Sequence, residues 1–274
     1  MNENQSQKPI TAYLPQEWKP LHRDDLLRLG SKHDGGYIVT GNIIRYTDFL
    51  VSLGIGTDWT FGEDFHKRIL CPVHCYDHTI SLGQFIKYAL GDVKHLLGTQ
   101  HILNIRRPYL PNILLPLKYK TFFSENRKHF KEKIGDDPEY YTNFMKIFSR
   151  IPGGNKVFIK MDIEGWEYRA LSGLKDYYER ATGLAVEFHY LSTMMDRVRS
   201  HINELKKSFN IVHVHVNNYD GTYERGIPGT IEMTFENKEF SPVRERASQR
   251  IYPVAGLDSP NAINRIDYKL EFRD

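Results

Sequence analysis

The chain has 274 residues, of which 40% are hydrophobic and 26% charged, with a formal net charge of +3. This content of apolar side chains is enough for a packed core and excludes an intrinsically disordered chain. The basic residues are dispersed and form no stripe interleaved with aromatic residues, which disfavours nucleic acid as a partner. No apolar run reaches the length of a membrane span, and the polar start MNENQSQKP has no signal-peptide core. We therefore expect a cytoplasmic protein without membrane insertion, of an oligomeric state that the sequence leaves open.

The first half of the chain alternates between strand and helix patterns. Residues 1–12 are expected to form a disordered tail, and the Asp34-Gly35-Gly36 turn leads into a strand. Four elements then follow: a strand over 48–56, a helix over 57–70, a strand over 72–80 and a helix over 81–90. After a weaker strand near residues 101–104, residues 106–150 are interpreted as a long insertion. Within it, residues 124–134 (SENRKHFKEKI) have the charge pattern of an amphipathic helix.

The second half predicts the direction of the last strands. The expected elements are a strand over 156–163, a helix over 164–174, a strand over 183–191, a helix over 194–209, and strands over 211–219 and 229–237. The last two strands are joined by a short loop and must run antiparallel, because a parallel return needs a crossover. The irregular segment 241–274 is expected to pack across the sheet. The pattern predicts a doubly wound, mostly parallel, seven-stranded Rossmann-like α/β sheet with a C-terminal antiparallel hairpin, which is typical of class I methyltransferases. Residues 13–274 are expected to form one domain.

A glycine turn at the end of the first long strand is the candidate cofactor loop. Gly54 and Gly56 let the backbone approach a ligand at the start of a helix. A dinucleotide-binding loop requires a third glycine at position 59, which is Trp59 here. Asp77 lies at the end of the next strand, where a carboxylate can accept ribose hydroxyls from either NAD or S-adenosylmethionine. The loop therefore predicts nucleotide-cofactor binding, and both cofactors stay open at this point.

A zinc site in CPVHCYDH is disfavoured. Cys71, His74, Cys75 and His78 all lie in one short stretch, whereas structural zinc sites bring two ligand pairs together from separate segments. The stretch also has the pattern of a strand, which points alternate side chains to opposite faces.

Polar residues gather at the ends of three later strands. Asp162 ends the first, Glu187 and His189 end the second, and His213, His215 and Asn217 lie on the third. Ligands of open α/β sheets bind at this edge, so we expect Asp162 and His189 to be catalytic, with one of them as a general base. Asp162, Glu187, His189 and His215 are alternatively the ligands of a divalent cation of the Mg, Mn or Fe type. Each residue also has a structural interpretation: Asp162 as a helix cap, and His213 as a hydrogen-bonded core histidine.

Several segments together resemble FkbM-type methyltransferases. They are DGGYIV, SLGIGTDWTFGEDF, KMDIEGWEYRAL and AVEFH, while HVHVNNYDGTYERGIPGTIEMTFEN and YPVAGLDSPN are similar to family members from bacterial capsule and surface-sugar biosynthesis. The resemblance covers roughly residues 30–270, and Asp58 departs from the third glycine of the usual class I loop. It implies an S-adenosylmethionine-dependent O-methyltransferase for a sugar or nucleotide sugar, such as an activated heptose. It also adds Asp34 and Gly36 to Gly54, Gly56 and Asp77 as candidate cofactor-binding residues.

The long insertion is expected to shape the acceptor pocket, with Arg106, Arg107, Tyr109 and Tyr119 facing phosphate and sugar. Two alternatives to the methyltransferase remain. One is an NAD-dependent Rossmann oxidoreductase that uses the same glycine loop. The other is a non-catalytic binding protein on a methyltransferase scaffold, against which the polar strand ends argue.

Overall fold

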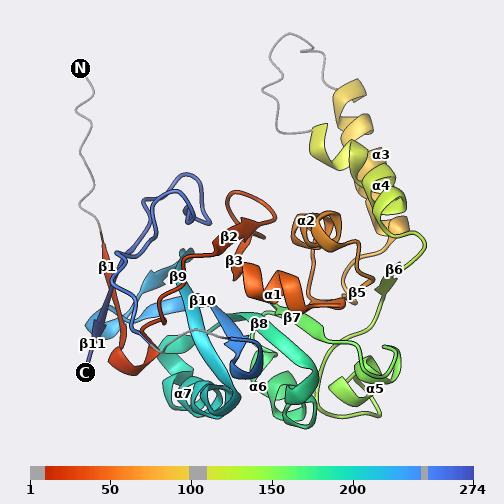
Figure 1. Ribbon diagram of the computed structural model, residues 1–274. Helices are drawn as coiled ribbons and strands as arrows, with labels where there is room; N and C mark the ends of the chain where they lie inside the picture. The colour runs from red at the N-terminus through yellow and green to blue at the C-terminus, as the bar shows by residue number, and fades with distance from the viewer. Residues whose placement is uncertain (1–9, 99–109, 242–245) are drawn as a thin grey trace, which may run out of the picture.

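A computed structural model describes residues 10–98, 110–241 and 246–274. Its main sheet has seven strands in the order β6-β5-β4-β7-β8-β10-β9 (Figure 1). Their bounds are β4 Phe49–Leu53, β5 Val73–Tyr76, β6 Arg127–Phe130, β7 Val157–Met161, β8 Ala181–Phe188, β9 Phe209–Thr222 and β10 Pro228–Asn237. Only β10 runs antiparallel to its neighbours, β8 and β9. The predicted fold class, a doubly wound sheet of the class I methyltransferase type with an antiparallel C-terminal strand, is confirmed.

Helices cover both faces of this sheet because its strands carry apolar side chains on both sides. On β4, Leu50 packs in one apolar cluster while Val51 and Leu53 pack in the other. The helices are α1 Gly41–Tyr46, α2 Thr60–Ile69, α3 Leu82–Gly98, α4 Leu110–Phe122, α5 Phe144–Ser149, α6 Glu167–Ala170 and α7 Leu191–Ser208. In α7 Val198, Ile202 and Leu205 are buried and Met195 is partly buried, and their helical spacing places them on the one face that packs against the sheet.

Two small sheets flank the main one. Strand β1 (Thr11–Pro15) pairs in parallel with β11 (Lys269–Arg273), and β2 (Leu26–Leu29) pairs antiparallel with β3 (Tyr37–Thr40). The predicted disordered tail over 1–12 is too long at its C-terminal end, because Thr11 and Ala12 belong to β1 and Ala12 is fully buried. Residues 1–9 lie outside the described residues. The C-terminal segment packs against β9 as expected, through His213 and Asp258.

The region interpreted as an insertion contains part of the main sheet. The prediction of a helix over 124–134 is wrong: Arg127–Phe130 forms β6, which pairs in parallel with β5. The charged composition that indicated a helix is also what a sheet-edge strand uses to stay soluble. The weak strand expected near residues 101–104 lies outside the described residues. Helices α3 and α4 lie side by side and stand out from the body of the molecule (Figure 1).

Candidate active site

A cavity of about 500 Å³ opens at the carboxyl ends of the central parallel strands. Its wall includes residues from the glycine loop after β4, from the segments that follow β5 and β6, and from the end of β7. Among them are Gly54, Gly56, Asp77, Lys133, Lys160 and Asp162. This is the edge of an open α/β sheet where ligands bind, and it is the edge that the sequence predicted.

The two glycines of the loop serve different purposes. Gly54 has a φ of 71°, and a Cβ there would lie 1.7 Å from the carbonyl oxygen of Asp162. Its glycine is therefore required by the close backbone contact between the ends of β4 and β7. Gly56 has a φ of 48° and lines the cavity, and a Cβ there would meet nothing within 4 Å. Gly56 is thus the position where the absence of a side chain leaves room for a ligand.

Asp77 holds the glycine loop in place. Its Oδ2 accepts the N–H groups of Ile55 (3.0 Å) and Gly56 (2.9 Å), and its Oδ1 accepts the N–H (2.8 Å) and hydroxyl (2.6 Å) of Thr79. Burial opposes ionisation, but these hydrogen bonds outweigh it and lower the pKa of Asp77. A carboxylate has about four lone-pair positions, and all four are in use. A ribose at Asp77 would have to share them.

The turn before β3 contributes one carboxylate to the cavity. Asp34 lines the wall, and burial together with the charge of Asp162 raises its pKa. Gly36 does not line the cavity: a Cβ there would lie 1.9 Å from the carbonyl oxygen of Ser31. Gly36 is thus needed for the packing of the turn. Asp58 accepts a hydrogen bond from Ser31 Oγ and another, of 2.8 Å, from the N–H of Thr60, so it joins this turn to the start of α2.

A buried lysine that the sequence analysis did not single out lies at the centre of the site. Lys160 Nζ donates to the Gly54 carbonyl oxygen at 2.6 Å and to Asp162 Oδ2 at 3.1 Å. Burial lowers the pKa of the ammonium group, but Asp162 and Glu187 outweigh that effect, so the pKa is raised. Lys160 and Asp162 are two residues apart at the end of β7. The period of two along a strand is the signal that could have indicated their shared side.

Tyr37 joins the ends of β7 and β8. Its hydroxyl lies 3.3 Å from Asp162 Oδ2 and 3.2 Å from Glu187 Oε2. Glu187 Oε1 accepts a 2.6 Å hydrogen bond from Asn217 Nδ2, so both of its oxygens are used within the protein. Burial and the charges of Asp162 and Glu232 raise the pKa of Glu187 well above its usual value. The strands that carry Asp162 and Glu187, β7 and β8, are neighbours in the sheet.

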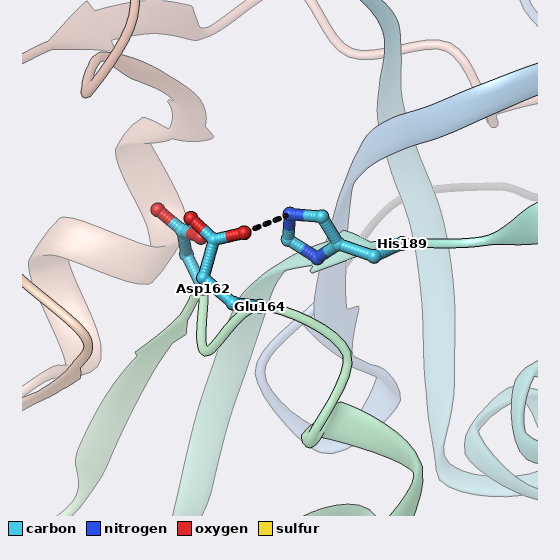
Figure 2. A group of neighbouring side chains, drawn as sticks. All are labelled: Asp162, Glu164 and His189. Carbon is cyan, nitrogen blue, oxygen red and sulfur yellow. Dashed lines mark ion pairs between the residues drawn. The ribbon is translucent and has the colours of Figure 1, made fainter. Parts of the chain in front are cut away.

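Asp162, Glu164 and His189 converge beside the cavity (Figure 2). Each offers one ligand atom, and these atoms all lie within 4.8 Å of one another. His189 Nε2 lies 3.6 Å from Glu164 Oε2, while His189 Nδ1 donates to Glu167 Oε1 at 3.2 Å. Burial lowers the pKa of His189, but the bond to Glu167 and nearby carboxylates outweigh it and raise the pKa to about 9. The imidazole is therefore cationic at neutral pH in the ligand-free protein.

Glu167 holds the His189 ring in its orientation through the bond to Nδ1. Its side chain is fully buried, and Oε1 also accepts the N–H groups of Ile163 (2.9 Å) and Gly165 (3.3 Å). A carboxylate that holds one ring nitrogen of a histidine directs the other nitrogen toward a ligand, as carboxylates hydrogen-bonded to metal-binding histidines do.

Not all of the predicted site residues meet. Asp162 and His189 lie together, but His215 does not join them. His215 Nδ1 lies 3.4 Å from Glu232 Oε2, and Nε2 lies 3.1 Å from Asp267 Oδ2. The reason is the register of β10, which places Glu232 directly opposite both Glu187 and His215. Glu232 therefore separates His215 from the cluster, and Glu164 is the third member instead.

His213 matches its structural interpretation. Its Nε2 bonds to Asp258 Oδ1 at 2.9 Å, and the pair is buried.

In CPVHCYDH, Cys75 and His74 pack toward different apolar clusters, and the His74 ring lies edge-on to Phe49. Burial raises the pKa of Cys71 and Cys75 to about 12.

The segment after β6 supplies one end of the cavity. Glu132, Lys133 and Ile134 line it together with Trp166, and Lys133 Nζ lies 3.9 Å from the centre of the Trp166 ring. Tyr119 is not on the wall: its hydroxyl bonds to His129 Nδ1 at 2.7 Å and its ring packs edge-on to Trp59. Arg106, Arg107 and Tyr109 lie outside the described residues.

No protein-family model and no curated protein matches the sequence. Among solved structures, the protein is similar to an rRNA methylase from Streptococcus thermophilus (10% identity, TM-score 0.37, over 72% of this chain and 92% of that chain). It is also similar to a precorrin-6y C5,15-methyltransferase from Geobacter metallireducens (10% identity, TM-score 0.36, over 72% and 84%). A third is the fibrillarin pre-rRNA processing protein of Methanococcus jannaschii (9% identity, TM-score 0.37, over 71% and 68%). At these values the likeness concerns the fold alone, and the strand order of the main sheet carries the fold assignment.

Proposed function

We propose that the protein is an S-adenosylmethionine-dependent methyltransferase that methylates a hydroxyl oxygen of a sugar or nucleotide sugar. The observation that carries this proposal is the cavity at the sheet edge, where Gly56 leaves open space on the wall. Its volume of about 500 Å³ lies within the range of small-molecule sites, about 300–1,000 Å³. In this proposal residues 13–274 act as one methyltransferase domain.

The charges of the site favour this cofactor over NAD. Adenosylmethionine carries a cationic sulfonium and an ammonium group. At that end the cavity presents the carboxylates of Asp34, Asp162 and Glu164 together with the ammonium of Lys160, and the imidazolium of His189 lies beside Glu164. NAD instead brings an anionic pyrophosphate that needs free N–H groups at the glycine loop. The N–H groups of Ile55 and Gly56 are already bonded to Asp77. These donors are therefore not free for a phosphate.

A divalent cation fits the cluster of Asp162, Glu164 and His189 and forms the second part of the proposal. Mixed carboxylate and imidazole ligands suit Mg²⁺, Mn²⁺ or Fe²⁺. Glu167 accepts a hydrogen bond from His189 Nδ1 and so directs Nε2 toward the cation. A bound cation of this kind would lower the pKa of a hydroxyl that it contacts. Without it, the pKa of about 9 makes His189 a poor base at neutral pH. Asp162 is then the residue positioned to accept the proton of the hydroxyl.

The acceptor class rests on the resemblance of the motifs to FkbM-type methyltransferases of capsule and surface-sugar biosynthesis. In this proposal Asp162 lies beside the transferred methyl group and holds the hydroxyl in line, because a sulfonium is already activated and positioning is most of what the protein adds. The end of the cavity formed by Glu132, Lys133 and Trp166 shapes the remainder of the pocket.

Calorimetry with adenosylmethionine, adenosylhomocysteine and NAD tests the cofactor, and the mass of products from a panel of nucleotide sugars tests the acceptor. We expect binding of the first two ligands and a mass gain of one methyl group on a sugar. Binding of NAD alone would contradict the proposal and favour the oxidoreductase. Methylation of catechols or protein side chains but not of sugars would reject the acceptor class. Adenosylmethionine binding without turnover of any acceptor would favour a binding protein.

A further inference from the structure

The two helices α3 and α4 form an arm that stands out from the body of the molecule (Figure 1), and large apolar side chains are exposed on it. In the described part of the chain, 17 large hydrophobic residues are exposed, and six of them lie on these two helices. They are Ile86, Tyr88, Leu90, Val93, Leu114 and Leu117. The remaining exposed residues are scattered, as is normal for a protein surface. The arm is therefore the place where exposed apolar side chains concentrate.

These side chains follow the spacing of helix faces. Ile86, Leu90 and Val93 are spaced i, i+4 and i+7 on α3, and Leu114 and Leu117 are spaced i and i+3 on α4, so each helix carries an apolar stripe. The stripes are separate from the residues that anchor the arm. Phe85, Leu115 and Phe122 are buried in the same cluster as Trp59, and they already satisfy the packing of the arm onto the body.

The charge of the arm indicates what the stripes contact. Helices α3 and α4 carry four lysines and one aspartate, and Lys87, Lys118 and Lys120 are exposed among the apolar residues. A second copy of the arm would bring a second set of lysines against the first, which repels it. An anionic lipid surface attracts the lysines and accepts the apolar side chains. In the described part of the chain, no helix is both long and apolar enough to cross a membrane.

We propose that the α3–α4 arm binds the surface of an anionic lipid bilayer, with the apolar stripes among the headgroups and the lysines at the lipid phosphates. This binding does not depend on the cavity or on the proposed methyl transfer.

Sedimentation with vesicles tests the proposal on the full chain. We expect binding to vesicles of 70% phosphatidylcholine and 30% phosphatidylglycerol, weaker binding as the salt concentration rises, and little binding to pure phosphatidylcholine. Leu114→Gln/Leu117→Gln should weaken binding by about tenfold or more, because two partly exposed leucines lose their transfer into an apolar layer. Lys118→Gln/Lys120→Gln should weaken it by about fivefold for each lysine removed.

The matched control is Leu70→Gln/Ile251→Gln. These residues are 72% and 77% exposed, more than any of the six exposed apolar residues named on the arm, but lie elsewhere, so this variant should bind like the wild type. Adenosylmethionine binding and circular dichroism of each variant check that the body stays folded. The proposal is overturned if the wild type does not bind anionic vesicles, or if the Leu114/Leu117 variant binds equally well. It is also overturned if light scattering shows a dimer that this variant converts to a monomer, because the stripes then serve a second copy.

Discussion

Replacing Lys160 with methionine tests the central ion pair of the site. Methionine keeps the length of the side chain but removes the ammonium group that bonds to the Gly54 carbonyl and to Asp162. Loss of one partner of a buried pair costs about 3–5 kcal/mol. We expect the lower end, about 3 kcal/mol, because the Asp162 side chain is 24% exposed and water can reach it. In a chain of 274 residues this corresponds to a decrease in Tm of roughly 6–12 °C.

Urea denaturation and thermal unfolding of the wild type and four variants measure the effect. Lys156→Met is the matched control: this half-buried lysine donates to the Glu179 backbone carbonyl at 2.8 Å and lies 5.1 Å from the centre of the Phe240 ring, so we expect a loss within about 1 kcal/mol. In an Asp162→Asn background, Lys160→Met should be milder by about 1–2 kcal/mol, since the pair is already broken. Equal stability of Lys160→Met and Lys156→Met would refute the stabilising role of the Lys160 bonds that connect the ends of β4 and β7. A double-mutant cycle that shows no coupling energy between Lys160 and Asp162 would refute it as well.

Three further predictions concern the cofactor, the cation and the dependence of stability on pH. Gly56→Val should abolish adenosylmethionine binding in calorimetry. Gly154 also has a positive φ and open space around it, so Gly154→Val should cost the same backbone strain of about 1–2 kcal/mol but leave binding intact. Equal binding by both variants would exclude Gly56 from the pocket. Addition of MnCl₂ should raise the Tm of the wild type but not that of Glu164→Gln. The control Glu139→Gln, at another exposed glutamate, should respond like the wild type. A rise in the Tm of Glu164→Gln equal to that of the wild type would remove Glu164 from the cation site. Burial disfavours charge on His215, but Asp267 and Glu232 outweigh it and raise the folded-state pKa to about 10. The stability that the charged imidazole contributes is fully present below the unfolded pKa of about 6.5. It is lost as the pH rises through about 10. Urea denaturation between these pH values should show a smaller alkaline decrease in His215→Gln than in the wild type, and identical decreases would contradict the ion pair.

Most strands and helices of the main sheet could be predicted because the pattern of each element is local. The strand and helix runs from residue 48 to 90 and from 156 to 237 carry their own apolar periodicity, and the short loop before 229–237 leaves only an antiparallel return. The third strand could not be found in the same way. Residues 127–130 read RKHF and have weak strand propensity, so their structure depends on pairing with β5, which no local pattern reveals.

The candidate site was predictable to the level of strand ends. Asp162 and His189 follow two neighbouring strands, and their meeting follows from parallel pairing. His215 failed to join them because of Glu232, whose place between Glu187 and His215 depends on the register of β10. Glu164 lies in the turn after β7 and has a left-handed φ of 55°, and Glu167 follows as the first residue of α6. The direction of side chains in such a turn follows from backbone geometry that the sequence pattern does not specify.

The position of β10 has a consequence for the order in which the chain folds. Strand β9 is made before β10 but has no partner in the main sheet other than β10, which lies between it and β8. During synthesis β8 therefore keeps an open edge, and β9 has no place to dock, until residue 237 has emerged. Open strand edges attract other chains, and late non-local pairing slows folding. Completion of the sheet is thus a late step, and Glu187 receives its bond from Asn217 only after it.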